Sequence, residues 1–184
     1  MDRFDLTAHN TMALLVDLQE RFLPVIPSIG ADQPCGRKAK LLSDGMRLLG
    51  VPVIVTKQYP KGLGPTLPHL VSADQTVFAK THFSCVDDPV VREFIADSQR
   101  THVVLAGIEA HVCVLATVAD LIASGKWVVV AADAVDSRDP AHAALALEAM
   151  RGLGALTLPV ESILFRVQRQ AGVGAFKQLS ALVK

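Results

Sequence analysis

Cys113 has a reactive side chain at a position where a nucleophile could be placed. It follows an apolar run, Thr101–Ala106, and lies at the start of a helical pattern that covers Val112–Ser124. Free N–H groups and the dipole of a helix N-terminus stabilise a thiolate, the form of cysteine that attacks carbonyl carbons. A lone cysteine in an apolar segment is more often structural, and we interpret Cys35 and Cys85 in that way. Catalysis by Cys113 therefore requires partner residues.

Asp17 and Lys80 are the two residues that could serve such a nucleophile. Asp17 directly follows the apolar run Thr11–Val16, and a carboxylate at the mouth of an apolar sheet can accept the proton of a thiol. Lys80 follows a similar run, Thr76–Phe78. Each has an ordinary alternative, because an Asp at a strand end commonly caps a helix or turn and most lysines are solvated. Together with the cysteine they would form a nucleophile, a base and a positioning cation.

Short apolar runs alternate with longer amphipathic segments, and these elements must position the three residues. Continuous apolar runs indicate strands that are covered on both faces, as in a parallel sheet. The six predicted strands are Thr11–Val16, Pro52–Thr56, Thr76–Phe78, Thr101–Ala106, Trp127–Ala132 and Ala155–Leu158. The predicted helices are Cys35–Leu49, Pro89–Ser98, Val112–Ser124, Pro140–Leu153 and a final one near Ala171–Lys184. This alternation predicts a doubly wound three-layer α/β/α sandwich, in which ligands bind beyond the carboxyl ends of the strands.

The composition of the chain argues against several classes of protein. Its 184 residues suit one domain, and we predict that residues 1–184 form it. Basic and acidic residues balance at 18 each, so no overall field would gather nucleic acid or an acidic membrane. We also expect no signal peptide and no membrane-spanning helix. Three scattered cysteines without a CxxC pair suggest reduced thiols, and we expect a cytoplasmic protein.

In this order, Asp17, Lys80 and Cys113 resemble the Asp–Lys–Cys triad of the isochorismatase-like cysteine hydrolases. The resemblance also covers Ala13–Phe22, Gln58–Gly64, Phe78–Ser84, Gly107–Cys113, Asp133–Arg138 and Phe176–Lys177. Together these stretches are most similar to the isochorismatase domain-containing subgroup. The resemblance implies a six-stranded parallel sheet in the order 3-2-1-4-5-6, with strands one and four at the switch point. Asp17 and Cys113 would then face each other, and the long side chain of Lys80 would reach them.

The resemblance also implies a mechanism. Asp17 takes the proton of Cys113, Lys80 steadies both anions, and the thiolate attacks an electrophilic carbon such as an amide carbonyl. A group such as ammonia leaves, and water then hydrolyses the thioester. The family places oxyanion donors on the backbone N–H groups that match Glu109 and Cys113. A non-proline cis peptide often accompanies them, and it corresponds here to the bond between Ile108 and Glu109.

The residues around the triad narrow the substrate class. Nicotinamidases of the same superfamily carry a metal-binding Asp-x-His after the second strand, whereas this chain has Thr56–Tyr59 there and an isolated His69. We therefore predict no catalytic metal, no cofactor and no nicotinamidase activity. Cys113 disfavours isochorismatase activity too, because vinyl-ether hydrolysis needs no cysteine nucleophile. Candidates for contacts with a small-molecule substrate, which could also be ordinary turn, surface or core residues, are Gln19, Phe22, Gln58 and Tyr59.

Two other classes of function remain open. In the first, the chain is a redox or thiol-reactive protein in which peroxide oxidises Cys113, although no resolving cysteine is near in sequence. In the second, it is a non-catalytic member of the fold, and the intact triad counts against that. A neutral chain can self-associate, and we expect a homo-oligomer such as a dimer or tetramer. We assign no catalytic role to His82 or His111, which we interpret as supporting or interface residues.

Overall fold

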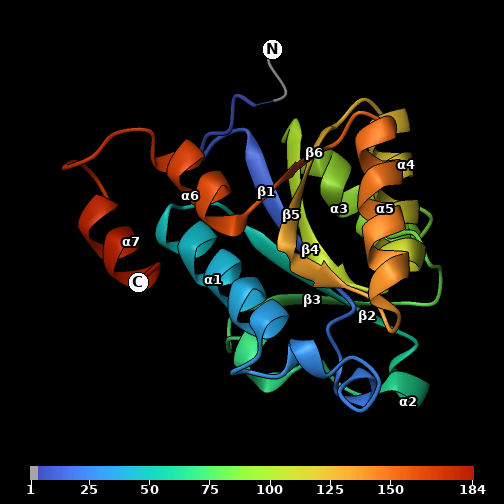
Figure 1. Cartoon of the computed structure of the whole chain (residues 1–184). Helices are drawn as coiled ribbons and strands as arrows, with labels where there is room; N and C mark the ends of the chain where they lie inside the picture. Colours follow the sequence, from blue (N-terminus) through green and yellow to red (C-terminus); the bar gives the residue numbers. More distant parts are fainter. Residues whose placement is uncertain (1–3) are drawn as a thin grey trace.

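The computed structural model describes residues 4–184, and its sheet has six parallel strands (Figure 1). They are β1 (Thr11–Val16), β2 (Val53–Gln58), β3 (Thr76–Lys80), β4 (His102–Ile108), β5 (Trp127–Asp136) and β6 (Leu156–Leu158). Their spatial order is β3-β2-β1-β4-β5-β6, and every neighbouring pair is parallel. The predicted sheet and its order are confirmed. β1 and β4 are neighbours, so the switch point of the doubly wound fold lies between them.

Helices cover both faces of the sheet, as Figure 1 shows. One layer contains α1 (Pro34–Leu48), α6 (Val160–Gln168) and α7 (Phe176–Leu182), and the other contains α3 (Pro89–Asp97), α4 (Leu115–Ala123) and α5 (Pro140–Gly152). Short turns are η1 (Glu20–Phe22), η2 (Pro27–Ile29), α2 (Pro60–Leu63), η3 (Pro68–Leu70) and η4 (Ala110–Val114). Along β1, alternate residues enter the two layers: Leu15 packs on the α1 side and Leu14 on the α4 side. This explains why the strand is apolar throughout.

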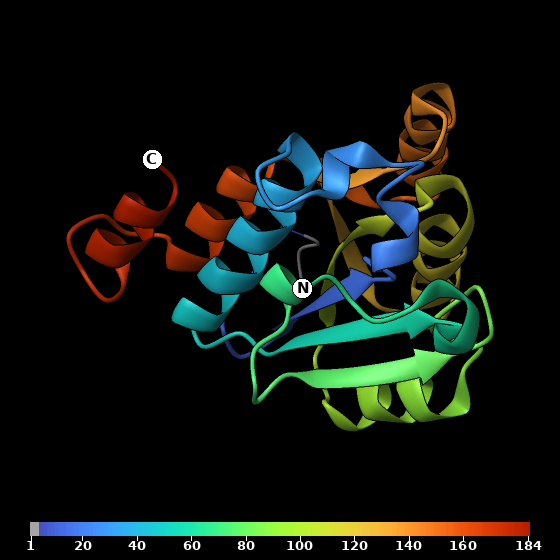
Figure 2. The same cartoon turned by 90° about the horizontal axis from the view of Figure 1, so that it is seen from below.

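Figure 2 shows α1 and α6 side by side, with α7 outside them. The sequence analysis missed α6, although Val160, Ile163, Leu164 and Val167 have the spacing of a helical apolar face. The Asp133 carboxylate accepts a hydrogen bond from the backbone N–H of Val160 at 2.8 Å, which helps to start this helix. No helix among residues 4–184 combines the length and the hydropathy that a membrane crossing requires.

Gly107 allows β1 and β4 to approach closely beside the switch point. It pairs with Val16 and has φ of 150°. A Cβ atom at this position would overlap the carbonyl oxygen of Val16, so no other residue fits without displacing a strand. Asp17 follows Val16 directly, and Cys113 follows Gly107 by six positions. The glycine therefore fixes the separation of the two strands that carry these residues.

Candidate active site

Asp17 is held in a strained and buried position at the end of β1. Its backbone is left-handed, with φ of 57°, and the residue is 1% exposed. Such a conformation costs about 1–3 kcal/mol outside glycine, and it persists only where the surroundings enforce it. Thr56 of β2 supplies two contacts: its carbonyl oxygen accepts from Asp17 N at 3.2 Å, and its Oγ1 donates to Asp17 Oδ1 at 2.8 Å. The carboxylate therefore has a fixed orientation.

Lys80, at the end of β3, brings a buried ammonium to this carboxylate. Its Nζ lies 2.8 Å from Asp17 Oδ2 and 2.7 Å from Gln58 Oε1. The carbonyl oxygens of His82 and Phe83 lie 3.0 and 3.1 Å from the same nitrogen. Burial is the largest single influence and disfavours the charged amine. The charge of Asp17, the hydrogen bond with it and the neighbouring thiols of Cys85 and Cys113 together outweigh burial, so the pKa of Lys80 is raised above its usual range. The surroundings of Lys80 therefore favour its charged form, the form that a positioning cation needs.

Cys113 lies in η4, a wide π-helical turn between β4 and α4, and is 6% exposed. Turns of this kind are frequent at functional sites. Burial raises the pKa of the Cys113 thiol, and the charge of Asp17 and a hydrogen bond with it raise it further, while Lys80 acts in the opposite direction. The sequence analysis expected the helix start to favour a thiolate. In the resting site the net effect is the reverse, so Cys113 carries a proton that the neighbouring carboxylate can accept.

Gln19 and Gln58, two of the candidates for substrate contacts, have their side chains engaged with protein atoms. Gln19 is fully buried, and its Nε2 donates to the carbonyl oxygens of Gln58 and Gly64 at 3.0 and 2.8 Å. Its Oε1 accepts from Gln58 N at 2.7 Å. Gln58 Nε2 donates to Thr81 O at 2.8 Å, while its Oε1 faces Lys80. These contacts fix the loop after β2 and orient the ammonium.

Phe22 and Tyr59, the other two candidates, differ in exposure. Phe22 is partly buried and packs against the core cluster on the α1 side of the sheet. Tyr59 directly follows β2 with φ of 36° and is 54% exposed. A Cβ on Gly62 would lie 2.6 Å from the Tyr59 ring, so the glycine makes room for this ring. Tyr59 is therefore the candidate whose side chain is available to a ligand.

The peptide bond between Ile108 and Glu109 is trans, and the expected cis bond is wrong: the described residues contain no cis peptide. A left-handed Glu109, with φ of 51°, reverses the chain there instead. The carboxylate of Glu109 is 8% exposed and pairs with Arg138 Nε. His111 Nδ1 lies 3.4 Å from Glu109 Oε2 and 3.0 Å from Ser137 Oγ. In a Ser–His–acid triad, one ring nitrogen of the histidine faces the serine and the other faces the acid. Here both contacts involve Nδ1 of His111, so this cluster is not such a triad.

Cys85 and Thr56 belong to the site, and the sequence analysis assigned neither to it. Cys85 is fully buried, and its Sγ lies 3.8 Å from Thr56 Oγ1. Its backbone N–H donates to Thr117 Oγ1 at 3.0 Å, and that hydroxyl donates to the carbonyl oxygen of Cys113 at 2.7 Å. The alternation of β2 places Thr56 on the same face as Gln58, and from this pattern the position of Thr56 at the site could have been predicted.

His82, to which the sequence analysis assigned no catalytic role, lies apart from these residues. Its side chain is half exposed, and its Nδ1 lies 3.8 Å from Asp88 Oδ2.

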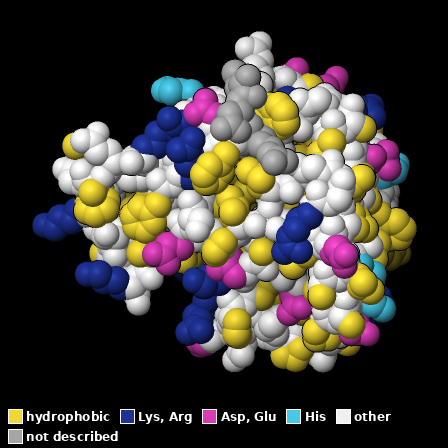
Figure 3. Space-filling view, turned by 45° about the horizontal axis from the view of Figure 1, so that its top comes forward, with side chains coloured by type: hydrophobic (Ala, Val, Ile, Leu, Met, Phe, Trp, Pro, Cys, Tyr) yellow, Lys and Arg dark blue, Asp and Glu magenta, His cyan; other side chains and the backbone are white. Residues whose placement is uncertain are grey.

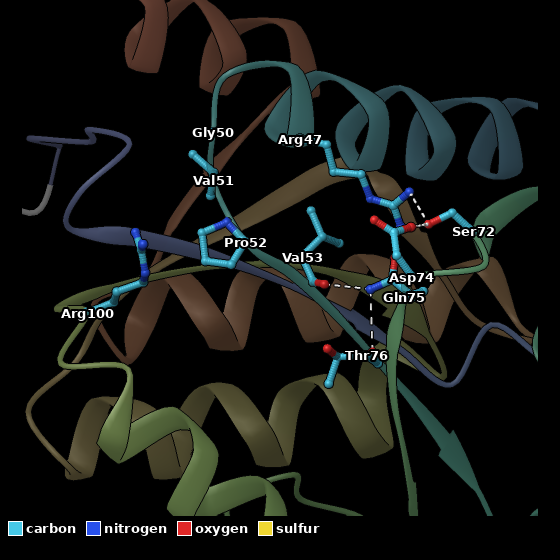
Figure 4. A pocket seen from close by; sticks show the side chains of 10 residues that line it. All are labelled: Arg47, Gly50, Val51, Pro52, Val53, Ser72, Asp74, Gln75, Thr76 and Arg100. Carbon is cyan, nitrogen blue, oxygen red and sulfur yellow. Dashed lines mark hydrogen bonds between the residues drawn. The ribbon is translucent and has the colours of Figure 1, made fainter.

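A hollow of about 440 Å³ lies at the opposite edge of the sheet (Figure 4). It is lined by residues that precede β2, β3 and β4, together with the end of α1. Its polar groups bond to one another: Arg47 Nη1 donates to Ser72 Oγ at 2.8 Å, and Ser72 Oγ donates to Asp74 Oδ1 at 2.6 Å.

Within residues 4–184, no group of three or more His, Cys, Asp or Glu side chains is placed to hold a metal ion.

Comparison with known proteins agrees with the fold. The isochorismatase domain profile matches residues 11–162. Isochorismatase domain-containing protein 2A of Mus musculus is 37% identical over 175 residues, an alignment that covers 95% of this chain and 83% of the mouse protein. The match thus includes all six strands and the residues Asp17, Lys80 and Cys113.

Two solved structures extend the comparison. A structure described as MAR1 ribonuclease from Caenorhabditis elegans is 34% identical, with a TM-score of 0.87 and coverage of 97% of this chain and 91% of the worm chain. The ycaC gene product of Escherichia coli, described as an octameric hydrolase of unknown specificity, is 21% identical with a TM-score of 0.88, and the match covers 97% and 90% of the two chains. The second likeness concerns the fold alone. On the profile match and the identity to the mouse protein, this chain belongs to the isochorismatase family.

Proposed function

We propose that this chain is a cysteine hydrolase in which Cys113 is the nucleophile, Asp17 the base and Lys80 the positioning cation. The observation that carries the proposal is the ion pair of Lys80 and Asp17, whose side chains are 0% and 2% exposed. A buried ion pair seldom stabilises a fold more than apolar side chains of the same volume would. Its presence beside a cysteine at the switch point therefore favours a catalytic role.

The reaction that these residues support begins with proton transfer from Cys113 Sγ to Asp17. The sulfur forms a bond to the carbonyl carbon of a small amide, and the backbone N–H groups of Glu109 and Cys113 donate hydrogen bonds to the oxyanion. The C–N bond then breaks, and the amine leaves with the proton held by Asp17. Water attacks the resulting thioester, Asp17 takes one proton from it, and this proton returns to the sulfur as the acid is released. Lys80 keeps its proton throughout and stabilises the anionic states.

The substrate class that we propose is a small molecule with an amide or related C–N bond, hydrolysed without a metal or cofactor. The residues Thr56–Tyr59, which lack the Asp-x-His of nicotinamidases, support this choice. Exposed Tyr59 is our candidate for a substrate contact. We further propose that residues 1–184 act as one domain in a cytoplasmic homo-oligomer. The three free, buried cysteines support a cytoplasmic location. The octamer described for the E. coli protein supports a homo-oligomer.

Ammonia release from a panel of small primary amides tests the proposal. Cys113→Ala is expected to remove turnover, while Cys35→Ala, which changes another buried cysteine outside the site, keeps it. Rapid quenching and intact-mass measurement are expected to show an acyl adduct on Cys113. Dialysis against a chelator is expected to leave the rate unchanged. Full turnover by folded Cys113→Ala protein, or a loss of activity on chelation, would contradict the proposal.

RNA is the substrate suggested by the name of the worm protein, and we expect this chain not to cleave it. The formal net charge is zero, and contact with phosphates depends on clustered Lys and Arg. On the face shown in Figure 3, basic side chains are interspersed with acidic and apolar ones. A labelled single-stranded RNA incubated with wild-type protein and with Cys113→Ala protein checks this expectation. Cleavage by the wild type alone would replace the amide proposal by an RNA-directed one.

A further inference from the structure

We propose that Thr56 and Cys85 form a hydrogen-bond relay that stabilises Asp17 in both of its protonation states. Thr56 lies on β2, Cys85 lies in the loop after β3, and both are fully buried. Thr56 Oγ1 is 2.8 Å from Asp17 Oδ1 and 3.8 Å from Cys85 Sγ. The inference rests on the proposed function, because it concerns what happens when Asp17 receives the proton of the nucleophile. Neither residue needs to touch the substrate, so both are positioning residues.

The number of hydrogens fixes the direction of the relay in the resting site. A hydroxyl has one hydrogen and two lone pairs, and an ionised carboxylate accepts only. Thr56 therefore gives its hydrogen to Asp17, which leaves only lone pairs toward the sulfur of Cys85. The thiol is then the donor to Thr56. Burial raises the pKa of Cys85 to about 11, so its sulfur keeps this hydrogen at neutral pH.

The relay reverses when Asp17 becomes an acid. The ammonium of Lys80 occupies Oδ2 at 2.8 Å, so the favoured place for the new proton is Oδ1. The O–H of Asp17 then donates to Thr56 Oγ1, and the hydroxyl of Thr56 turns its own hydrogen toward Cys85 Sγ, a weak acceptor. Only hydrogens move. The buried carboxyl group therefore has a partner in each state, which matters because an unpaired polar group in such a place is costly.

Thr117 holds the relay in place relative to the nucleophile. Its hydroxyl accepts from the backbone N–H of Cys85 at 3.0 Å and donates to the carbonyl oxygen of Cys113 at 2.7 Å. One side chain of α4 thus links the loop that carries the second thiol to the turn that carries the first. Because Thr117 bonds to both segments, a movement of the turn that carries Cys113 also moves Cys85. The thiol of Cys85 thus keeps its position relative to the thiol of Cys113.

Site-resolved alkylation by iodoacetamide tests the relay without a known substrate. In this reaction Cys113 Sγ displaces iodide, a C–S bond replaces the C–I bond, and Asp17 takes the thiol proton. Thr56→Val keeps the shape of the side chain but removes the hydroxyl. We expect the alkylation rate of Cys113 at pH 7 to fall about ten- to hundredfold, because Asp17 loses the contact that fixes its orientation and a displacement of about 1 Å can cost a factor of that size. The acid side of the rate–pH profile is expected to move to higher pH, because the carboxylate loses a donor.

The conservative variants separate positioning from structure. Thr56→Ser is expected to restore the wild-type rate and pH profile, because it keeps the donor. Cys85→Ala is expected to lower the rate by only about twofold, since it removes a weak sulfur contact. Thr66→Val is the matched control: Thr66 is buried, and its Oγ1 has no hydrogen-bond partner among the described residues, so the rate is expected to stay unchanged.

Two distinct results would overturn the two proposals. If folded Thr56→Val protein, checked by circular dichroism, reacts at Cys113 with the wild-type rate and pH profile, the relay is wrong. If Cys113 of the wild type reacts at pH 7 no faster than buried Cys35, the proposed base catalysis fails first. Peptide mass spectrometry after timed quenching reports both cysteines in the same sample.

Discussion

The amino and carboxyl edges of the sheet both need turns with positive φ, but they place different residues in them. Before β2, β5 and β6, these positions hold Gly50, Gly125 and Gly154, with φ between 74° and 103°. A Cβ on any of them would meet no atom within 4 Å, so only backbone preference selects glycine there. After β1, β2 and β4, the corresponding positions hold Asp17, Tyr59 and Glu109. At the amino edge, glycine relieves the backbone strain of these turns. At the carboxyl edge, residues with side chains occupy the turns despite the strain.

The two edges also treat charge differently. At the amino edge, Arg47 of the hollow in Figure 4 bonds to a serine hydroxyl at a partly open surface. At the carboxyl edge, Lys80 and Asp17 form an ion pair that solvent does not reach. Buried charge requires surrounding groups that hold it, and strained backbone requires the same. The coincidence of both at one edge identifies the candidate site better than the presence of a hollow does.

Removal of one cation at each edge is expected to give the largest difference. Lys80→Met leaves the Asp17 carboxylate buried without its partner, and we expect a loss of about 3–5 kcal/mol in the free energy of unfolding together with loss of activity. Arg47→Met removes a side chain whose Nη2 is buried without a hydrogen-bond partner in the described structure, and we expect a loss below about 1 kcal/mol. Urea unfolding of both variants measures this. If both variants lose the same free energy of unfolding, the proposed difference in how the two edges hold charge is wrong.

The buried thiols predict how stability depends on pH. Burial raises the pKa of Cys35 to about 12 from an ordinary value of 9.0, so between these values the unfolded chain has lost a proton that the folded chain keeps. The stabilising contribution is complete below pH 9 and is lost as pH rises toward the folded value. We expect Cys35 to contribute a decline of about 1.4 kcal/mol per pH unit in this window.

Cys35→Ala is expected to remove only this share of the decline, measured by urea unfolding at pH 8 and pH 11. Cys85, at the carboxyl edge, also has a raised pKa, so part of the decline persists in the variant. A stability profile for Cys35→Ala that runs parallel to that of the wild type would show that burial of Cys35 is not the cause.

The smallest expected effects come from relief of backbone strain. Gln99 precedes β4 with φ of 54° and is the amino-edge exception, since it is not glycine. Gln99→Gly and Tyr59→Gly are each expected to stabilise the fold by up to about 1 kcal/mol. Only Tyr59→Gly is expected to raise KM for an amide substrate, because that residue lies at the carboxyl edge. Thermal unfolding and steady-state kinetics on both variants check this, and a raised KM in Gln99→Gly would contradict the separation of the two edges.

Much of this architecture could be predicted from the sequence, because continuous apolar runs have few alternatives. The run Thr11–Val16 became a strand with those same bounds. Gly50, Gly125 and Gly154 each have positive φ just after a helix, at a position where glycine is the usual residue. The strand order came from the family resemblance rather than from periodicity. Pairing of Asp17 with Lys80 followed from that order, because both residues end strands at the same edge.

The polar contacts around the triad could not be predicted in the same way. Gln58 was a candidate for substrate, yet its amide orients Lys80, because a side chain at the end of β2 can face either ligand or protein and spacing does not decide which. Cys85 follows β3 in an irregular loop, where no period assigns a direction. The expected cis bond is absent, and the chain turns there at a left-handed Glu109 instead. Hydrogen-bond partners depend on tertiary geometry, which a single sequence does not encode locally.

The ammonium of Lys80 has three hydrogens and four neighbouring acceptors. The carbonyl oxygen of Phe83 is the most distant of the four, at 3.1 Å, and Phe83 itself is 61% exposed. Withdrawal of this carbonyl would leave three acceptors for three hydrogens. The fourth acceptor is therefore not required. If the loop around Phe83 shifts when a molecule binds, each of the three hydrogens of the ammonium still has an acceptor, and the ion pair with Asp17 is kept.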